Sequence, residues 1–197
     1  MTFTREVSEC RAPANESSSE LAQARLLVSR GEFETAEELV AALCANDVPE
    51  AFYLRSCFSM PSEDYAAFER RHLSDLQRAA NADFAPAIHA LATYYETGEL
   101  VAQDVRMATQ LFQRAALLGH PQSQWRIGVQ LLYGAGVLER NTAGGLALVS
   151  AAADAGFRGA LETMAKLHDT GAFGVEENPS RAQDLREQAA RPDALDY

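Results

Sequence analysis

A block of sequence recurs at a fixed interval along this chain. The tetrapeptide Gln77-Arg78-Ala79-Ala80 returns 36 residues later as Gln113-Arg114-Ala115-Ala116, and the same offset relates the small residues Ala51, Ala87 and Ser123. Periods of this length are typical of helical hairpins, each of which buries its apolar face only against its neighbours. The period therefore predicts an all-α fold, a right-handed α-solenoid of stacked helical hairpins.

Glycines and alanines indicate how each hairpin turns and packs. Gly98 and Gly134 recur with the period and suit the left-handed turn that ends the first helix of a hairpin. Asp104, Thr142 and Ser180 can each cap or lead into a second helix. Second helices end in paired small residues, which the close approach of two backbones requires: Ala79-Ala80, Ala115-Ala116, Ala152-Ala153 and Ala189-Ala190.

These signals define the expected domain organisation. A single solenoid domain is predicted over residues 17–190, made of hairpins at about 17–48, 51–82, 86–119, 122–156 and 159–190. Residues 1–16 are polar and aperiodic, which predicts a flexible N-terminal arm. Residues 191–197 are expected to form a C-terminal tail.

The repeated part of the chain resembles the Sel-one-like repeat family. One copy has Leu91-Ala92, Tyr95, Gly98, Val101, Asp104, Ala108, Phe112 and Ala115-Ala116, and the next has Ile127-Gly128, Gly134, Gly136-Val137, Leu148 and Ala152-Ala153. A third copy, starting at Ala160, is weaker. The resemblance covers about residues 51–190 and is specific over 85–175. It implies an α-solenoid that mediates protein–protein contacts and has no catalytic residues.

The first two hairpins depart from that family pattern. Arg55-Ser56 stands where Leu-Gly is usual, and Pro61-Ser62-Glu63-Asp64 replaces the glycine turn. In the first hairpin the small, large, aromatic and proline positions are Ala24, Leu27, Phe33, Ala36, Val40 and Pro49. This stretch resembles a tetratricopeptide repeat, although the tryptophan and the first glycine of that motif are missing. The N-terminal hairpin is therefore expected to be tetratricopeptide-like.

The charge of the chain limits its partners. The net charge is −11, and residues 1–50 carry 4 basic and 10 acidic side chains. Nucleic acid is not an expected partner, because phosphate contacts need clustered Lys and Arg. A protein or peptide is expected, and a basic one fits the acidic surface; the alternative is that the charge only maintains solubility.

The location expected for the chain is the cytoplasm, without membrane insertion. No stretch approaches the roughly 20 apolar residues of a membrane span, and residues 1–12 do not read as a secretory signal. Cys10, Cys44 and Cys57 are odd in number and lack CxxC spacing, which fits a reducing compartment.

Catalytic chemistry is not expected. His72, His89, His120 and His168 form no HxxxH pair, and Gly134-Ala135-Gly136 lacks the basic residue of a phosphate loop. No cofactor and no metal site are predicted, and the chain is not expected to be an enzyme. A hydrolase or small-molecule sensor would need a pocket with convergent polar groups.

A binding groove is predicted on the first helices, which line the concave surface of such arrays. The repeat register assigns to it Tyr53, His89, Thr93, Glu96, Trp125, Val129, Leu132, Tyr133, Glu162 and Lys166. Trp125 is either a binding anchor or a core residue, and His89 either titrates or only forms a hydrogen bond. Lys166 and Glu162 also have the i,i+4 spacing that supports a helix.

The expected function is a non-catalytic scaffold or adaptor that binds a partner protein or peptide in this concave groove. The alternative is a dedicated inhibitor, immunity protein or chaperone of a basic effector or toxin, which would act through the acidic N-terminal hairpin.

Overall fold

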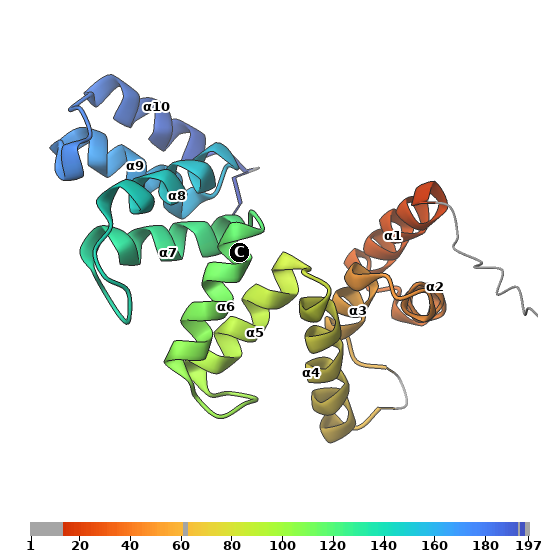
Figure 1. Ribbon diagram of the computed structural model, residues 1–197. Helices are drawn as coiled ribbons and strands as arrows, with labels where there is room; N and C mark the ends of the chain where they lie inside the picture. The colour runs from red at the N-terminus through yellow and green to blue at the C-terminus, as the bar shows by residue number, and fades with distance from the viewer. Residues whose placement is uncertain (1–13, 61–62, 193, 196–197) are drawn as a thin grey trace, which may run out of the picture. The chain divides into compact units, whose positions relative to one another are not determined.

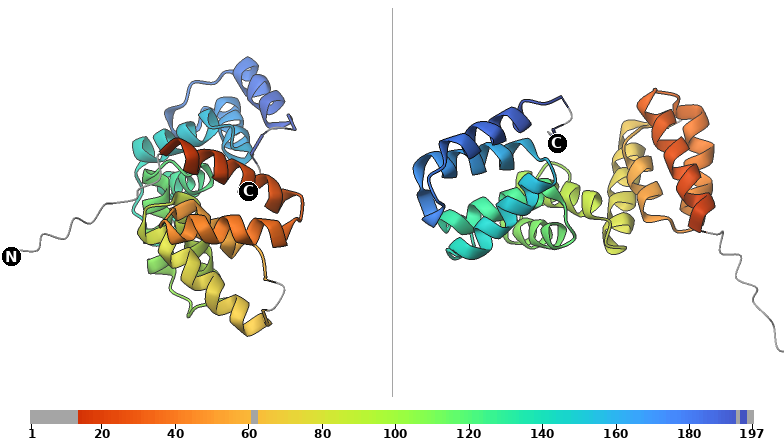
Figure 2. Two further views of the ribbon diagram at one scale, coloured as in Figure 1. Left: turned by 90° about the vertical axis from the view of Figure 1, so that its right-hand side faces the viewer. Right: turned by 90° about the horizontal axis from the view of Figure 1, so that it is seen from above.

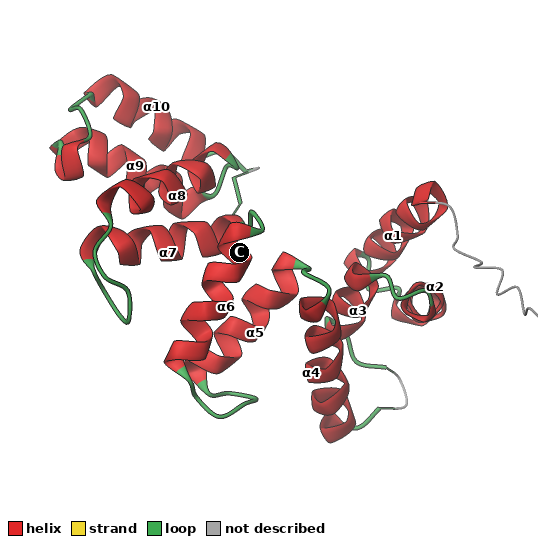
Figure 3. Cartoon of the chain, in the orientation of Figure 1, coloured by secondary structure: helices red, strands yellow, loops and turns green. Residues whose placement is uncertain are grey.

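The computed structural model describes residues 14–60, 63–192 and 194–195. Over these residues it contains α-helices, one short 3₁₀ turn and no strand (Figure 3). The helices form five successive hairpins (Figure 1): α1 (Ala14–Ser29) with α2 (Phe33–Ala45), α3 (Pro49–Ser56) with α4 (Tyr65–Asn81), α5 (Ala85–Thr97) with α6 (Val105–Leu117), α7 (Pro121–Tyr133) with α8 (Thr142–Asp154), and α9 (Arg158–Thr170) with α10 (Pro179–Ala189). The prediction of an all-α solenoid of helical hairpins is confirmed.

The chain divides into two compact units, with the division between Ala82 and Asp83. The N-terminal unit contains the hairpins α1/α2 and α3/α4, and the C-terminal unit contains the other three. Figure 2 shows the stacked helix pairs within each unit from two further sides. One continuous domain over residues 17–190 and the right-handed sense of the superhelix stay predictions.

Two expected boundaries shift. Helix α1 begins at Ala14, so residues 14–16 of the expected arm are helical, and residues 1–13 lie outside the described residues. Near the C-terminus, the Leu195 N–H donates to the Gly156 carbonyl (3.0 Å), and the Arg158 N–H donates to the Leu195 carbonyl (2.9 Å). Leu195 therefore pairs with the linker between α8 and α9 instead of extending away from the fold.

The turn inside each hairpin of the C-terminal unit follows one design. Gly98, Gly134 and Gly171 end the first helices in the left-handed conformation, with φ of +76°, +66° and +62°. The predicted role of Gly98 and Gly134 is thereby confirmed. The N-caps of the second helices also hold the turn, because the N–H of Asp104, Asn141 and Asn178 donates to a carbonyl of the preceding helix (2.8–2.9 Å). Thr142 and Ser180 lie just inside their helices, so they lead in rather than cap.

The paired alanines pack where the sequence expects close contact, with one exception. Ala79-Ala80, Ala115-Ala116 and Ala152-Ala153 are all buried, whereas Ala190 is the exposed C-cap of α10. The backbones of α7 and α8 approach closely, because a β-carbon added to Gly145 would lie 2.8 Å from the Gly128 carbonyl oxygen. Small residues thus set the spacing of these helices.

The arginine of the repeated tetrapeptide also has a structural role. Arg78 pairs with Asp47 (2.9 Å) and Arg114 pairs with Asp83 (2.7 Å), each 31 residues back. Both aspartates adopt positive φ in the linkers between hairpins, where the later linkers have Gly119 and Gly156. In the hairpins that follow Gly119 and Gly156, the position equivalent to the arginine holds Ala151 and Gln188. The arginine therefore accompanies a left-handed aspartate.

Candidate protein-interaction surface

Trp125 fills the contact between the first helices α7 and α9. Its indole N–H donates to Oγ1 of Thr163 (3.0 Å), and its ring lies 5.5 Å from that of Phe157. A β-carbon on Gly159 would lie 3.3 Å from the indole, so the ring covers that glycine closely. Trp125 is half-buried against the core of the C-terminal unit. It is a packing residue with its donor engaged, and partner binding by it stays a prediction.

His89 occupies the contact between α5 and α7. Its Nδ1 lies 2.8 Å from the hydroxyl of Ser123, and its ring stacks on that of His120 at 4.4 Å. The pKa of both histidines is lowered to about 4, mainly by burial, and for His89 the neighbouring His120 and Arg126 contribute to the lowering. At neutral pH both imidazoles are therefore uncharged, and His89 has a hydrogen-bonding role.

Leu132 does not belong to a surface. It is 1% exposed and packs in the core of the C-terminal unit with Val149 and Leu161, so its assignment to the groove was wrong. Consecutive residues on a helix are rotated by about 100°, which places the neighbouring Tyr133 outward when Leu132 points inward. Val129 is half-buried against the same core.

The remaining groove residues differ in accessibility. Thr93, Tyr133, Glu162 and Lys166 are exposed on the first helices of the C-terminal unit. Glu96 is half-buried and forms an ion pair with Arg126. The Arg126 guanidinium also lies over the ring of Phe112, 4.5 Å from its centroid.

Tyr53 belongs to the other unit. It lies half-buried in α3, and its carbonyl accepts hydrogen bonds from the side chains of Ser56 (2.7 Å) and Cys57 (3.2 Å). The exposed surface described above is made only of residues from the C-terminal unit.

An aromatic contact joins the turns of the last two hairpins. Tyr133, at the end of α7, is 63% exposed, and its ring meets the ring of Phe173 edge to face at 5.2 Å. Arg140 lies over the Phe173 ring, 5.5 Å from its centroid. Phe173 has a φ of +58°, which costs a bulky residue about 1–2 kcal/mol. The sequence shows an extra residue between Gly171 and Val175, but its spacing does not reveal this contact.

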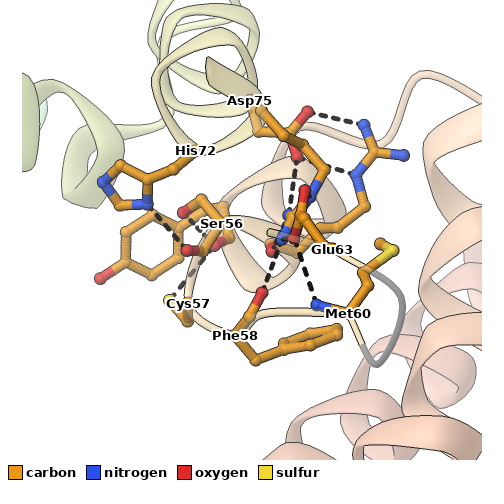
Figure 4. A network of polar contacts seen from close by, with 10 residues as sticks. Ser56, Cys57, Phe58, Met60, Glu63, His72 and Asp75 are labelled. Carbon is orange, nitrogen blue, oxygen red and sulfur yellow. Dashed lines mark hydrogen bonds and ion pairs between the residues drawn. The ribbon is translucent and has the colours of Figure 1, made fainter. Parts of the chain in front are cut away.

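The N-terminal unit contains a polar network that the sequence analysis missed (Figure 4). Asp75 is 2% exposed and accepts two hydrogen bonds from Arg55, at 2.6 and 2.8 Å. Arg71 also approaches Asp75 (3.5 Å) and donates twice to Glu63, at 2.7 and 2.8 Å. The hydrogen bonds from Arg71 lower the pKa of the Glu63 carboxyl, and the bond to Asp75 raises the pKa of the Arg55 guanidinium.

In this hairpin, which lacks the glycine turn, the network holds the backbone at the end of the first helix. Arg71 donates to the carbonyls of Arg55 (2.5 Å) and Phe58 (2.8 Å), and the His72 ring contacts the Ser56 carbonyl (2.8 Å). These carbonyls lie at the end of the short helix α3 and just after it. The charged side chains of the network pair with one another, which indicates that the network has a structural role.

Three nucleophilic side chains, Ser123, Cys44 and Cys57, lie in surroundings that lower their reactivity. Ser123 touches two histidines, but it is 0% exposed and inaccessible to a substrate. Burial raises the pKa of the Cys44 thiol to about 11 and also raises that of Cys57, which disfavours the thiolate. Within the described residues, no group of three or more His, Cys, Asp or Glu side chains could hold a metal ion.

Comparison with known proteins decides the family. The model of the Sel1 repeat, the Sel-one-like repeat named above, matches residues 85–120, 121–157 and 160–191, more than half of the chain. The chain belongs to the Sel1 repeat family. The matched segments correspond to the three hairpins of the C-terminal unit, which we call the Sel1 hairpins. The tetratricopeptide-like character of the first hairpin stays a prediction.

Solved structures agree with this assignment. A Sel1 repeat protein from Oxalobacter formigenes aligns with a TM-score of 0.71 at 21% identity, over 89% of this chain and 73% of that one. A protective antigen of uropathogenic Escherichia coli with the same repeat fold aligns with a TM-score of 0.60 at 25% identity, over 78% of this chain. The chain spans about a third (32%) of that antigen. No curated protein matches the chain.

Membrane insertion was not expected from the sequence. Among the helices that the structure describes, none is both long enough and apolar enough to cross a bilayer.

Proposed function

We propose that this Sel1 repeat protein is a non-catalytic scaffold that binds a partner protein through the first helices of its Sel1 hairpins. The observation that carries the proposal is a contrast within the repeat. The third residue of each of these helices is buried and small: Ala87, Ser123 and Ala160. Equivalent outer positions of the same helices vary, with Thr93, the half-buried Val129 and Lys166 at one position. At another position Tyr133 stands where α5 and α9 have Thr97 and Thr170.

This contrast is what a binding scaffold requires. Constant buried positions preserve the stacking of the hairpins, while variable exposed positions give each one a different contact chemistry. The groove assignment changes in detail, because Leu132 is core and Trp125 and His89 hold hairpins together. A cytoplasmic location belongs to the same proposal, since the spacing of the cysteines fits a reducing compartment.

Crosslinking in the native host tests this proposal. The full chain carrying Thr93→Arg and Glu162→Arg changes two exposed positions on first helices, and a matched control carries Gln110→Arg and Gln183→Arg on the second helices α6 and α10. We expect wild type and control to crosslink the same partner and the first-helix variant to lose it. Equal crosslinking by both variants, with the helical circular dichroism intact, contradicts the proposal.

An inhibitor or chaperone of a basic effector is the second candidate. It is favoured by the first hairpin, where Glu32, Glu34 and Glu38 are exposed beside Phe33, which is 40% exposed. Binding through this surface would weaken steeply as salt rises. The variant Glu34→Gln with Glu38→Gln would reduce the binding, whereas the first-helix variant, Thr93→Arg with Glu162→Arg, would not. Salt-insensitive binding argues against this candidate.

A further inference from the structure

The turns of the fourth and fifth hairpins, residues 134–141 and 171–178, have the same length, and their third residue differs: it is Gly136 in the fourth and Phe173 in the fifth. In the fourth hairpin the third residue of the turn is Gly136, with φ of +69°, and Val137 follows it. In the fifth hairpin Phe173 takes this left-handed place, with φ of +58°, and Gly174, with φ of +82°, stands where the fourth has Val137. The fourth hairpin makes its turn with glycine, so the fold itself does not require phenylalanine. A bulky residue held in this conformation points to a function.

The Phe173 ring completes an aromatic pair at the surface. It meets the Tyr133 ring at 86° and 5.2 Å, and the Arg140 guanidinium lies over it, 5.5 Å from its centroid. Tyr133 remains 63% exposed, so much of its ring is open to a partner. An aromatic pair that is already fixed loses little conformational freedom on binding, and such rings are enriched among the residues that dominate interface energies.

Carboxylates accompany this aromatic pair. The two turns, residues 134–141 and 171–178, carry Glu139, Glu176 and Glu177, and all three are exposed. Their one cation is Arg140, whose guanidinium lies on Phe173. Glu177 packs against Gly171, so its side chain lies in the same turn as Phe173. The turns therefore combine an open ring with excess negative charge.

We propose that Tyr133 and Phe173 anchor a basic segment of the partner protein. An Arg or Lys side chain of that segment covers the exposed face of Tyr133, where the ring quadrupole attracts a cation, and an apolar neighbour of that side chain contacts Phe173. Glu139, Glu176 and Glu177 pair with the remaining positive charge. The inference rests on the proposed function, because it names the anchor of the same protein-binding unit and the chemistry of its partner.

A library of random dodecapeptides, displayed on phage and selected on the full wild-type chain, tests this anchor. Enriched peptides are synthesised, and their affinities are measured by fluorescence anisotropy for wild type, Tyr133→Ala, Tyr133→Glu and Phe173→Gly. Thr97→Ala is the matched control, since Thr97 is exposed at the equivalent end of α5. We expect enriched peptides to carry Arg or Lys beside an apolar residue. Each Tyr133 and Phe173 variant should weaken binding by about tenfold or more, and the control should not.

The outcomes separate this inference from the proposed function. Peptides that are enriched on wild type but are acidic, or that bind Tyr133→Ala as tightly as wild type, overturn the anchor and leave the scaffold proposal standing. A selection that enriches no peptide contradicts both. Phe173→Gly should keep its thermal midpoint within roughly 5 °C of wild type, because glycine removes the left-handed strain. A larger fall assigns Phe173 to packing, and the Tyr133 variants then decide the question.

Discussion

The indole N–H of Trp125 donates a hydrogen bond to Oγ1 of Thr163 across the contact between α7 and α9. The Thr163 hydroxyl in turn donates to the Gly159 carbonyl (2.6 Å), which orients the oxygen that accepts the indole N–H. The only tryptophan of the chain is therefore committed to holding two Sel1 hairpins together.

Replacing Trp125 tests that role. Trp125→Ala should destabilise the protein by roughly 2–4 kcal/mol, because it removes a large half-buried ring. Thr163→Val should cost about 1 kcal/mol, since it leaves the indole N–H without its acceptor. Urea unfolding followed by circular dichroism measures both. Wild-type stability in Trp125→Ala would mean that the indole serves binding and not packing.

Asp75 should be the most sensitive charged residue of the N-terminal unit. Asp75→Asn leaves Arg55 and Arg71 facing a buried neutral group, and breaking a buried ion pair costs about 3–5 kcal/mol. Asp47→Asn is the matched control, because Asp47 pairs with Arg78 at a side chain that is 81% exposed. Its loss should cost less than about 1 kcal/mol. Similar unfolding free energies for the two variants would contradict a structural role for the network.

The linker residue Asp83 separates charge pairing from backbone conformation. Asp83→Gly loses the pair with Arg114 but accepts the φ of +60° without strain, so its stability should change by less than about 1 kcal/mol. Asp83→Ala loses the same pair and adds strain of about 1–2 kcal/mol. Thermal unfolding should rank Asp83→Ala below Asp83→Gly, and equal midpoints, both below wild type, would show that loss of the pair dominates.

Acid should weaken the contact between α5 and α7. His89 and His120 have pKa values of about 4 in the folded chain against 6.5 as the ordinary value. Well above pH 6.5 both histidines are neutral in the folded and unfolded states, so their full contribution to stability is present. As the pH falls from 6.5 towards 4, the unfolded chain takes up protons that the folded chain does not, and stability is lost.

The double variant His89→Gln, His120→Asn provides the measurement. Its urea midpoint should fall less than that of wild type between pH 6.5 and 4.5, because it lacks both titrating rings while Asn retains helix-capping ability. The carboxylates titrate equally in both proteins and cancel in the difference. Parallel pH profiles would mean that the two rings are not protonated on unfolding.

The sequence predicted the parts of this fold that local chemistry controls. Glycine at position 98 or 134 reverses the chain because it tolerates positive φ, and Asp104 caps a helix because its carboxylate reaches the N–H groups of Arg106 and Met107. Repetition then gave the number and the order of the hairpins. These features depend on a few neighbouring residues, so a single sequence contains them.

The candidate surface depended on contacts between helices, which only the tertiary structure decided. The period placed Leu132 and Tyr133 side by side on α7, but the rotation of that helix in its stack buries one and exposes the other. Arg55 and Asp75 are 20 residues apart, and Tyr133 and Phe173 are 40 apart, and no local signal links either pair. Side-chain packing across hairpins brings each pair together. The sequence by itself therefore determined the helices, the turns and the order of the hairpins, and the packing of the helices determined the surface.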